Sequence, residues 1–372
     1  MGWRLGLAGG LVALLVMACS GGAAAPARPE AAAGAPAGSA GGAAAGASGS
    51  APSGDAAPAG SASAAPAPLQ KLNVAILSTN ELQTIPWVAK DSGAFARHGF
   101  DVDVSVVAGS PRVTQSLIAG DFDYAIAGVS SLIRARIQGA DPMILATSSN
   151  TLGSFNILVA PDSGIHTIPD LRGRTVGVTQ YGSDADVFLH LALERAGMAA
   201  TDVNIVQHGG SPQGVAAVAS GGMQAAVVGG PSVLVALRTG LVSIAAAKDM
   251  HILSLSGTIA ATERRLAQRH DEALRFMQAY IEGIHYFKTQ RADTIDILRR
   301  HNADLPEDEA GYIYDEVVDV FQPLPLPTDE ALRAVIDRET EPGAPRLAPD
   351  DVADRSILHE IDRSGFVDAL YK

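Results

Sequence analysis

From residue 72 onward, short apolar runs alternate with longer stretches in which apolar residues recur at helical spacing. The apolar runs predict strands at residues 72–77, 101–107, 124–128 and 143–147. The periodic stretches predict helices at residues 86–98, 111–119 and 131–138. This alternation is typical of an α/β unit built on a mainly parallel sheet.

The same order of elements recurs about 100 residues later. The second set comprises predicted strands at 175–179, 203–206 and 225–229, and predicted helices at 183–196, from 212, and at 232–239. When the chain is shifted by 101 positions without a gap, residues 101–139 share eleven identities with residues 202–240. Because the period occurs only twice, it indicates two lobes built on one plan rather than a solenoid.

After the second lobe, residues 251–263 have the pattern of a strand that returns to the first lobe. Amphipathic helices are then predicted at about 267–288, 292–300, 308–320 and 329–338. We expect them to form a carboxy-terminal helical layer on the first lobe, with their charges on a solvated face.

Both lobes carry Gly-Ser-Pro, at 109–111 and at 210–212, directly after a predicted strand. Serine is a preferred N-cap and proline is favoured at the first helical position, so Ser110 and Ser211 are predicted to cap helices. In an open parallel sheet, such a helix begins beside the carboxyl ends of the strands, where ligands bind. Its free N–H groups and positive dipole end would face the ligand.

The candidate ligand-binding residues lie at these strand ends and helix starts. They are Thr79, Asn80, Thr84, Trp87, Ser110, Ser130, Ser131, Tyr181, Gly182, Ser183, Ser211 and Pro231. For each Ser or Thr, simple helix capping is the alternative interpretation, and for Trp87 it is packing in the core. We expect these residues to share one cleft because equivalent strand ends of the two lobes converge there.

The first 69 residues differ from the rest in composition. Residues 1–18 resemble a lipoprotein signal peptide, with Val16, Met17 and Ala18 before Cys19, the lone cysteine of the chain. Residues 20–69 are Ala, Gly, Pro or Ser at all but four positions, so residues 19–69 are predicted to be a lipidated Cys19 followed by a disordered linker. The alternative is an ordinary secretory signal with an incidental cysteine.

Charge and motifs exclude several classes of function. Without residues 1–18 the net charge is −14, which disfavours nucleic acid and anionic lipid surfaces as partners. The sequence contains no Gly-x-Ser-x-Gly, Walker loop or His-Glu-x-x-His motif, and its nine histidines are scattered. We therefore expect a monomer that is not an enzyme and that uses neither a cofactor nor a metal.

Four segments, in this order and spacing, resemble a known family: "WVAKDSGAFARHGFDVDV", "LIAGDFDYAIAG", "DSGIHTIPDLRGRTVGV" and "YIEGIHYFKTQRADTIDIL". The family is the sulfonate/nitrate/thiamine-precursor class of ABC-transporter substrate-binding proteins, and the similarity covers about residues 72–338. In the second lobe the family usually has an acidic residue where this chain has Gln224. This departure leaves the class of ligand open.

The resemblance implies a type II periplasmic-binding-protein-like α/β fold, with two α/β lobes joined by a two-segment hinge and a carboxy-terminal helical layer. The first lobe would comprise residues 70–155 and 257–372, and the second residues 156–256. The two hinge crossings would lie near residues 150–157 and 253–258. A small-molecule ligand would close between the lobes.

The leading hypothesis is an extracytoplasmic, lipid-anchored receptor that captures a small polar or anionic molecule and delivers it to an ABC permease. Its only link to the membrane would be the lipid. Two alternatives stay open. One is a ligand-sensing receptor for another transporter or a sensor kinase, and the other is a biosynthetic enzyme of the same fold, of the pyrimidine-precursor type.

Overall fold

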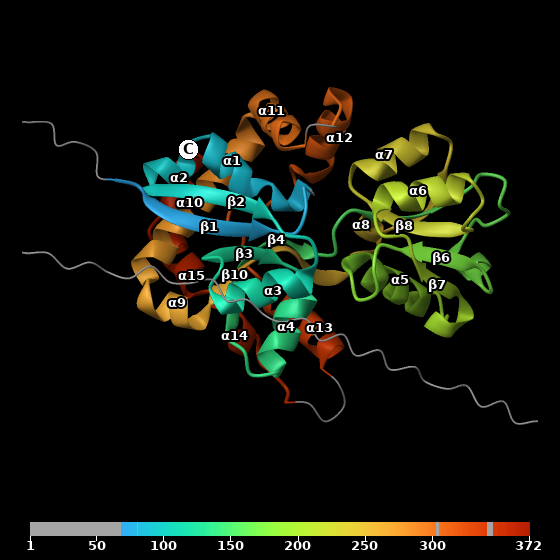
Figure 1. Ribbon diagram of the computed structural model, residues 1–372, viewed down its shortest axis with the longest axis horizontal. Coiled ribbons are helices and arrows are strands. Elements are labelled where there is room, and N and C mark those ends of the chain that lie inside the picture. Colours follow the sequence, from blue (N-terminus) through green and yellow to red (C-terminus); the bar gives the residue numbers. More distant parts are fainter. Residues whose placement is uncertain (1–67, 80, 303–304, 341–344) are drawn as a thin grey trace, which may run out of the picture. The chain divides into compact units, whose positions relative to one another are not determined.

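The computed structural model describes residues 68–79, 81–302, 305–340 and 345–372. The predicted signal peptide, Cys19 and nearly all of the predicted linker lie outside these ranges. Within them the chain forms two five-stranded sheets (Figure 1). The first sheet contains β1 (Gln70–Ile76), β2 (Phe100–Val106), β3 (Tyr124–Ala127), β4 (Pro142–Thr151) and β10 (Leu253–Thr262). The second contains β5 (Phe155–Val159), β6 (Thr175–Val178), β7 (Asn204–Gln207), β8 (Ala225–Gly229) and β9 (Val242–Ala246).

The two sheets have the same strand order. The first runs β2-β1-β3-β10-β4 and the second β7-β6-β8-β5-β9. In each, three neighbouring strands are parallel and the fourth position holds an antiparallel strand, β10 or β5. Each antiparallel strand is the first one after the chain crosses from the other sheet. The repeat seen in the sequence therefore corresponds to a repeat in topology.

The chain crosses between the sheets twice, through residues 152–154 and residues 247–252. The N–H of Leu152 donates to the carbonyl of Ile252 at 2.8 Å, so the two crossings are hydrogen-bonded to each other. The first crossing lies within the predicted range 150–157. The second precedes the predicted 253–258, because those residues belong to β10, where Leu253 pairs with Thr151 and Ser256 with Ser149 of β4.

The helices of the first lobe before the first crossing are α1 (Ile85–Asp91), α2 (Ala94–Arg97), α3 (Ser110–Ala119) and α4 (Val129–Ile137). Those of the second lobe are α5 (Asp184–Arg195), α6 (Ser211–Ala219) and α7 (Pro231–Arg238), with α8 (Ala247–Met250) in the second crossing. Short 3-10 turns are η1 (Glu81–Gln83), η2 (Ile168–Leu171) and η3 (Ala200–Asp202). The helix predicted at 86–98 is divided into α1 and α2 because Gly93 adopts a left-handed conformation, with φ of 77°.

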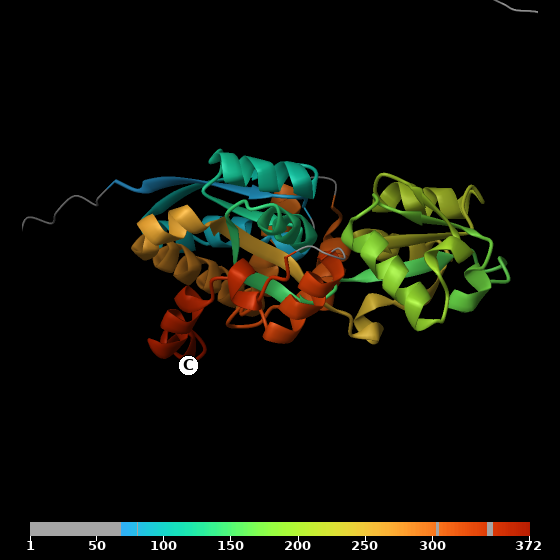
Figure 2. The same ribbon diagram turned by 90° about the horizontal axis from the view of Figure 1, so that it is seen from below.

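The helices after β10 are α9 (Glu263–Gln268), α10 (His270–Thr289), α11 (Arg291–His301), α12 (Glu307–Val317), α13 (Asp329–Glu339), α14 (Pro349–Val352), α15 (Ser356–Arg363) and α16 (Phe366–Leu370). They contact the first lobe, as predicted, and Figure 2 shows the end of the chain, in red, beside the orange α10. They cover both faces of the sheet rather than one. Phe276 of α10 packs in the same cluster as Val74, whereas Leu332 of α13 packs on the opposite face with Ala75.

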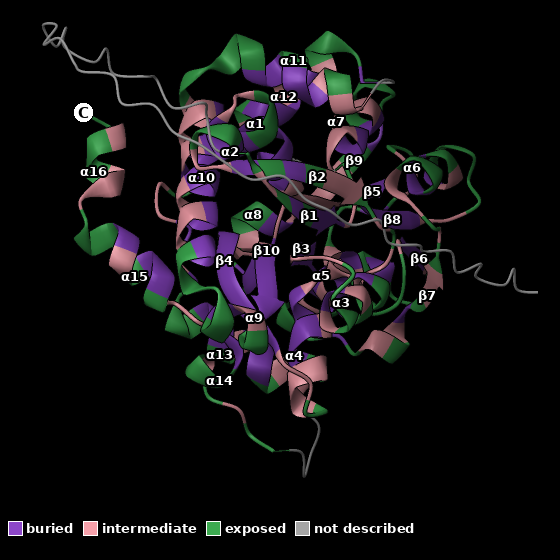
Figure 3. Cartoon of the chain, turned by 60° about the vertical axis from the view of Figure 1, so that its left-hand side comes forward, coloured by how far each residue is buried: buried purple, intermediate pink, exposed green. Residues whose placement is uncertain are grey.

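The buried side chains follow the strand period of two, since alternate residues of β1 point to opposite faces of the sheet. Figure 3 shows the buried positions, in purple, concentrated in the strands and on the inner sides of the helices that cover them. Separate clusters also lie on the two faces of the second sheet, around Phe188 on one face and Val218 on the other. The loops at the carboxyl ends of the parallel strands are left outside these cores.

Candidate functional site

A cavity of about 540 Å³ lies between the two lobes and is lined by the loops that follow their parallel strands. Its walls include the beginnings of α3 and α4 from the first lobe and of α5, α6 and α7 from the second. The unpaired N–H groups and the positive ends of these helix dipoles therefore surround one space. Such a volume is sufficient for a small organic molecule.

Eight of the twelve residues predicted to bind ligand line this cavity. They are Thr79, Ser110, Ser130, Ser131, Gly182, Ser183, Ser211 and Pro231. They come from both halves of the repeat, in keeping with the prediction that equivalent strand ends meet at one place.

The helix starts differ in detail from the prediction for Ser110 and Ser211. The N-caps are Gly109 and Gly210, and neither serine makes a side-chain capping hydrogen bond. Ser211 Oγ instead accepts a hydrogen bond from the N–H of Gly229 at 3.1 Å. Both serines therefore lie one position further into their helices than predicted.

The first lobe repeats this contact in a different form. A Cβ added at Gly128 would lie 2.5 Å from Ser110 Oγ, so the Ser110 side chain packs against the Gly128 backbone much as Ser211 packs against Gly229. The glycine that follows β3 is thus required by the close approach of a neighbouring serine. In each lobe, the serine of the Gly-Ser-Pro segment therefore packs against the glycine at the end of a neighbouring strand.

Ser183 is a cap, as predicted. Its Oγ accepts from the N–H of Asp186 at 3.4 Å and donates to the carbonyl of Gln180 at 2.7 Å. The Thr179 hydroxyl lies 2.8 Å from it. This loop is therefore held by its own hydrogen bonds before any ligand is present.

Three of the other predicted residues lie away from the cavity. Trp87 is buried in the core of the first lobe and stacks on His301, with ring centroids 4.6 Å apart. Thr84 is buried at the start of α1, and its carbonyl accepts the N–H of Trp87. Tyr181 is 59% exposed, and its hydroxyl donates to the carbonyl of Ile205 at 3.1 Å. The fourth predicted residue, Asn80, lies outside the described residues.

Trp87 packs in the core because α1 is buried nearly all round, at five consecutive residues from Ile85 to Ala89. Gln83 lines the cavity instead, and its Oε1 accepts from the N–H groups of Leu77 and Ser78 at 2.8 and 3.2 Å. The only sequence signal for Gln83 is its closeness to the end of β1.

Several other polar residues of the cavity were missed by the sequence analysis. They are Ser78, Thr179, Gln180, Asp184, Ser232 and Asn302. The sequence analysis treated Ser232 only as a helix start, although the shift of 101 positions aligns it with Ser131, which also lines the cavity. Ser232 is the second residue of α7, as Ser130 is the second residue of α4.

Ser130 and Ser232 are the most buried of the serines that line the cavity, at 6% and 9% exposed. Within the described part of the chain, neither hydroxyl has a hydrogen-bond partner. One comes from each lobe. Neither oxygen is among the fully buried unpaired atoms, so both hydroxyl groups face the cavity and are available to a bound molecule.

Asp184, the first residue of α5, is the one ionisable residue among the described residues that line the cavity. Burial raises the pKa of its carboxyl group to about 6, and nearby Glu339 adds to this, while Arg338 opposes it. The described lining contains no Lys, Arg or His. Among these lining residues, positive potential therefore comes from the backbone dipoles of the helix starts.

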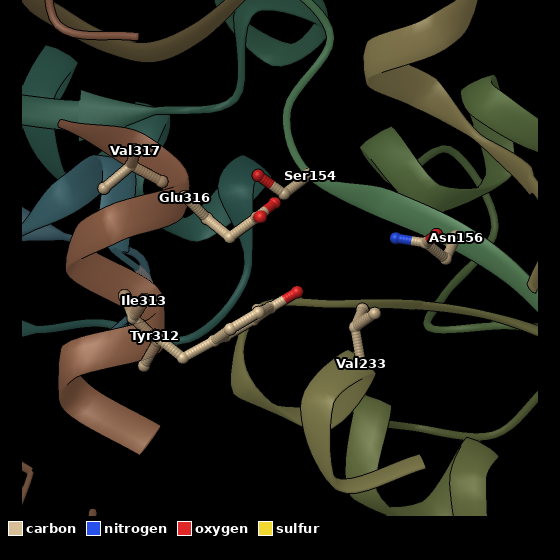
Figure 4. A pocket seen from close by; sticks show the side chains of 8 residues that line it. Ser154, Asn156, Val233, Tyr312, Ile313, Glu316 and Val317 are labelled. Carbon is tan, nitrogen blue, oxygen red and sulfur yellow. The ribbon is translucent and has the colours of Figure 1, made fainter. Parts of the chain in front are cut away.

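A smaller cavity lies next to this site, between the first crossing, α7 and α12. Figure 4 shows Tyr312 and Glu316 of α12 directed toward Ser154, Asn156 and Val233. Its volume of about 20 Å³ has room for about one water molecule. It is too small for a solute.

Within residues 68–79, 81–302, 305–340 and 345–372, no cluster of His, Cys, Asp and Glu could hold a metal ion. No helix in those ranges is both long and apolar enough to cross a bilayer.

Known proteins are similar to this chain in sequence or in fold. A Brucella abortus protein named as a binding protein is 28% identical over 217 residues, which cover 58% of this chain and 66%, just under two thirds, of the relative. The periplasmic aliphatic sulphonate binding protein SsuA of Escherichia coli matches with a TM-score of 0.62 and 20% identity, over 72% of this chain and 85% of that one. A desulfurization enzyme, DSZB, matches with a TM-score of 0.57 and 16% identity, over 78% and 99% of the two chains.

At these identities the solved structures establish the fold, and that fold confirms the two-lobe architecture expected from the sequence. Residues 83–292, more than half of the chain, match the family described as NMT1/THI5 like. The chain therefore belongs to the NMT1/THI5-like family and has the fold of periplasmic binding proteins.

Proposed function

We propose that this protein is an extracytoplasmic solute receptor that binds a small polar or anionic molecule between its lobes and delivers it to an ABC permease. The observation that carries the proposal is the cavity of about 540 Å³ lined by equivalent strand-end loops of both sheets. A curated relative is named as a binding protein, and a solved structure of the same fold is named as a periplasmic sulphonate-binding protein. Both names support a receptor.

In this proposal the two hydrogen-bonded crossings act as the hinge. Residues 152–154 and 247–252 are short, so the lobes can rotate about them while each sheet keeps its core. A ligand that contacts both walls would favour the closed arrangement, because it gains interactions there that the open one lacks. The permease would recognise the closed form.

The proposed location rests on the amino-terminal sequence. Val16, Met17 and Ala18 precede Cys19 after an apolar run, and we propose that Cys19 carries a lipid. If residues 20–69 form the linker that their composition predicts, it would reach roughly 40 Å from the anchor. That reach would keep the folded part close to a membrane permease.

We also propose that the protein leaves its ligand chemically unchanged. A same-fold relative, DSZB, is named as an enzyme, so the fold alone does not decide this point. The serines whose hydrogen bonds are described have structural partners: Ser183 bonds within its own loop and Ser211 accepts from Gly229. Neither is paired with a group that could act as its general base.

A thermal-shift screen of the purified full-length chain tests this proposal. The panel would contain sulfonates, carboxylates, nitrate, pyrimidines and amino acids. A ligand present at 100 times its Kd should raise the free energy of unfolding by about 2.7 kcal/mol, which is a measurable shift in Tm.

The Ser131→Trp variant identifies the site. Ser131 lines the cavity, so an indole ring there should fill the space and abolish the ligand-dependent shift. The matched control is Ser220→Trp, at an exposed position at the end of α6, which should keep the full shift. Equal shifts in both variants would place the binding site elsewhere.

A further inference from the structure

The hydroxyl groups of Ser130 and Ser232 pose a specific question about the ligand. Each residue is at least nine-tenths buried, each lines the cavity, and neither hydroxyl has a partner in the described ranges. Neither hydroxyl oxygen is among the fully buried atoms that lack a partner, so each is open to the cavity and can hydrogen-bond a bound molecule. The two groups come from different lobes, so a ligand that meets both would join the lobes.

A serine hydroxyl can both donate and accept a hydrogen bond. It therefore suits an uncharged polar group, such as an amide, a hydroxyl or a ring nitrogen, as well as an anion. The hydroxyl groups alone do not discriminate between an uncharged polar group and an anion. The charged residues around the cavity do discriminate between them.

No Lys, Arg or His is among the described residues that line the cavity. The one ionisable residue among them, Asp184, is acidic and lies at the start of α5, where it offsets the positive end of that helix dipole. Two arginines lie near the cavity, Arg134 beside Gly182 and Arg338 beside Asp184, and both bond to other groups. Arg134 pairs with Glu339 at 3.4 Å, and Arg338 donates to the carbonyl of Leu253 at 2.9 Å.

A sulfonate or carboxylate that entered this space would lose its hydration and meet a carboxyl group, with only neutral hydroxyl, amide and backbone donors as compensation. A molecule without net charge would lose much less hydration and could bond to both serines. We propose that the cavity selects small molecules that carry no net negative charge, and that Ser130 and Ser232 each bind an uncharged polar group of the ligand. This inference rests on the proposed receptor function and narrows its range of ligands.

Matched pairs of solutes that differ in one charge test the selection. Isothermal titration of the full-length chain would compare nicotinamide with nicotinate, propionamide with propionate, and taurine, which is a zwitterion, with ethanesulfonate. A wider thermal-shift panel of neutral, zwitterionic and anionic solutes would accompany these pairs. We expect the hits to be neutral or zwitterionic, with each anionic counterpart at least tenfold weaker.

The two ways of failing are distinguishable. Tighter binding of the anionic members would overturn this inference and leave the receptor function standing. Failure of every solute of every charge class to bind would contradict the receptor function, and this inference with it.

Single substitutions test the roles of Ser130, Ser232 and Asp184 in ligand selection. Ser130→Ala and Ser232→Ala should each weaken binding of the neutral solute about tenfold, whereas Ser220→Ala, at an exposed position, should not change it. Asp184→Asn should narrow the gap between the neutral and anionic members of a pair, and the exposed Asp162→Asn should not. Unchanged binding in both cavity serine variants, with an unchanged Tm in the absence of ligand, would overturn the role given to the serines.

Discussion

At the scale of single residues, position in the fold decides what a side chain can do. Asp184 follows the capping residue Ser183, where an acidic residue normally stabilises a helix. The structure places its carboxyl group in buried surroundings beside Glu339, and these raise its pKa to about 6. An ordinary first-turn acid has become a residue whose ionisation destabilises the folded protein.

Stability should therefore depend on pH through Asp184. Its pKa is higher in the folded protein than in the unfolded chain, so its contribution to the free energy of unfolding falls as pH rises from about 4 to 6. Asp184→Asn removes this penalty and should be more stable than the natural protein at pH 7.5, by about 1–2 kcal/mol, with no difference near pH 4. Urea denaturation at the two pH values measures this.

Asp170 is the control because its pKa is shifted the other way. Hydrogen bonds from His166 and Thr167 lower the pKa of its carboxyl group. Asp170→Asn should therefore destabilise the protein at pH 7.5, and the loss should shrink at low pH as the natural carboxyl group becomes protonated. An Asp184→Asn protein less stable than the natural one at pH 7.5 would refute the assignment.

At the scale of elements, the two halves of the repeat keep the same contacts with different residues. Asp123, just before β3, accepts from the N–H of Asn73 at 2.7 Å. Gln224, just before β8, accepts from the N–H of Thr175 at 3.1 Å. The departure of Gln224 from the family pattern thus preserves a hydrogen bond between strands, and it carries no information about the ligand.

Two glycines inside helices should respond in opposite ways to replacement by alanine. Gly283 lies in α10 where α1 packs against it, and a Cβ there would lie 2.8 Å from Ala89 Cβ. Gly311 lies in α12, where the nearest atom to an added Cβ is the flexible end of Arg291 at 3.4 Å. There is no room for a methyl group at Gly283, between α10 and α1, whereas there is room for one at Gly311.

Gly283→Ala should lower the free energy of unfolding by about 1–3 kcal/mol, because overpacking outweighs the gain in helix propensity. Gly311→Ala should raise it by about 0.5–1 kcal/mol. Both values come from urea denaturation without ligand. A Gly283→Ala protein more stable than the natural one would mean that α1 and α10 are less tightly packed.

At the scale of the whole molecule, α12 links the carboxy-terminal helices of the first lobe to the second lobe. Arg238 of α7 pairs with Asp308 at 2.6 Å, and Lys248 of α8 pairs with Glu316 at 3.0 Å. These pairs are largely exposed, so each contributes little to the free energy of unfolding. Because they join α12 to α7 and α8, their formation depends on how the two lobes are arranged.

The membrane anchor gives a prediction for the whole protein. Cys19→Ala should move the protein from the membrane fraction to the soluble fraction of a bacterial host and should abolish incorporation of radiolabelled palmitate. The natural chain is the control, and it has no other cysteine that could be acylated. A Cys19→Ala protein that stays in the membrane fraction would show that Cys19 is not the anchor.

The sequence alone was sufficient to predict the alternating strands and helices, the twofold repeat and the two-lobe fold. These depend on local periodicity and on glycine or proline punctuation, which act over a few residues. The short strands β5 and β9 were missed, and the break at Gly93 was not expected. The cavity-lining positions of Ser110, Ser130, Ser183 and Ser211 followed from strand ends that are adjacent in any such sheet.

Other features depend on contacts between distant parts of the chain, and only the tertiary structure could decide them. Trp87 lies in the core because α1 is buried nearly all round and His301, from a helix more than 200 residues away, stacks on it. Asp184 acquires its raised pKa from burial in the folded protein, and Ser130 and Ser232 line one cavity only because the two lobes face each other. Local pattern thus determined the plan of each lobe, whereas burial and charge from distant segments determined the character of the cavity between them.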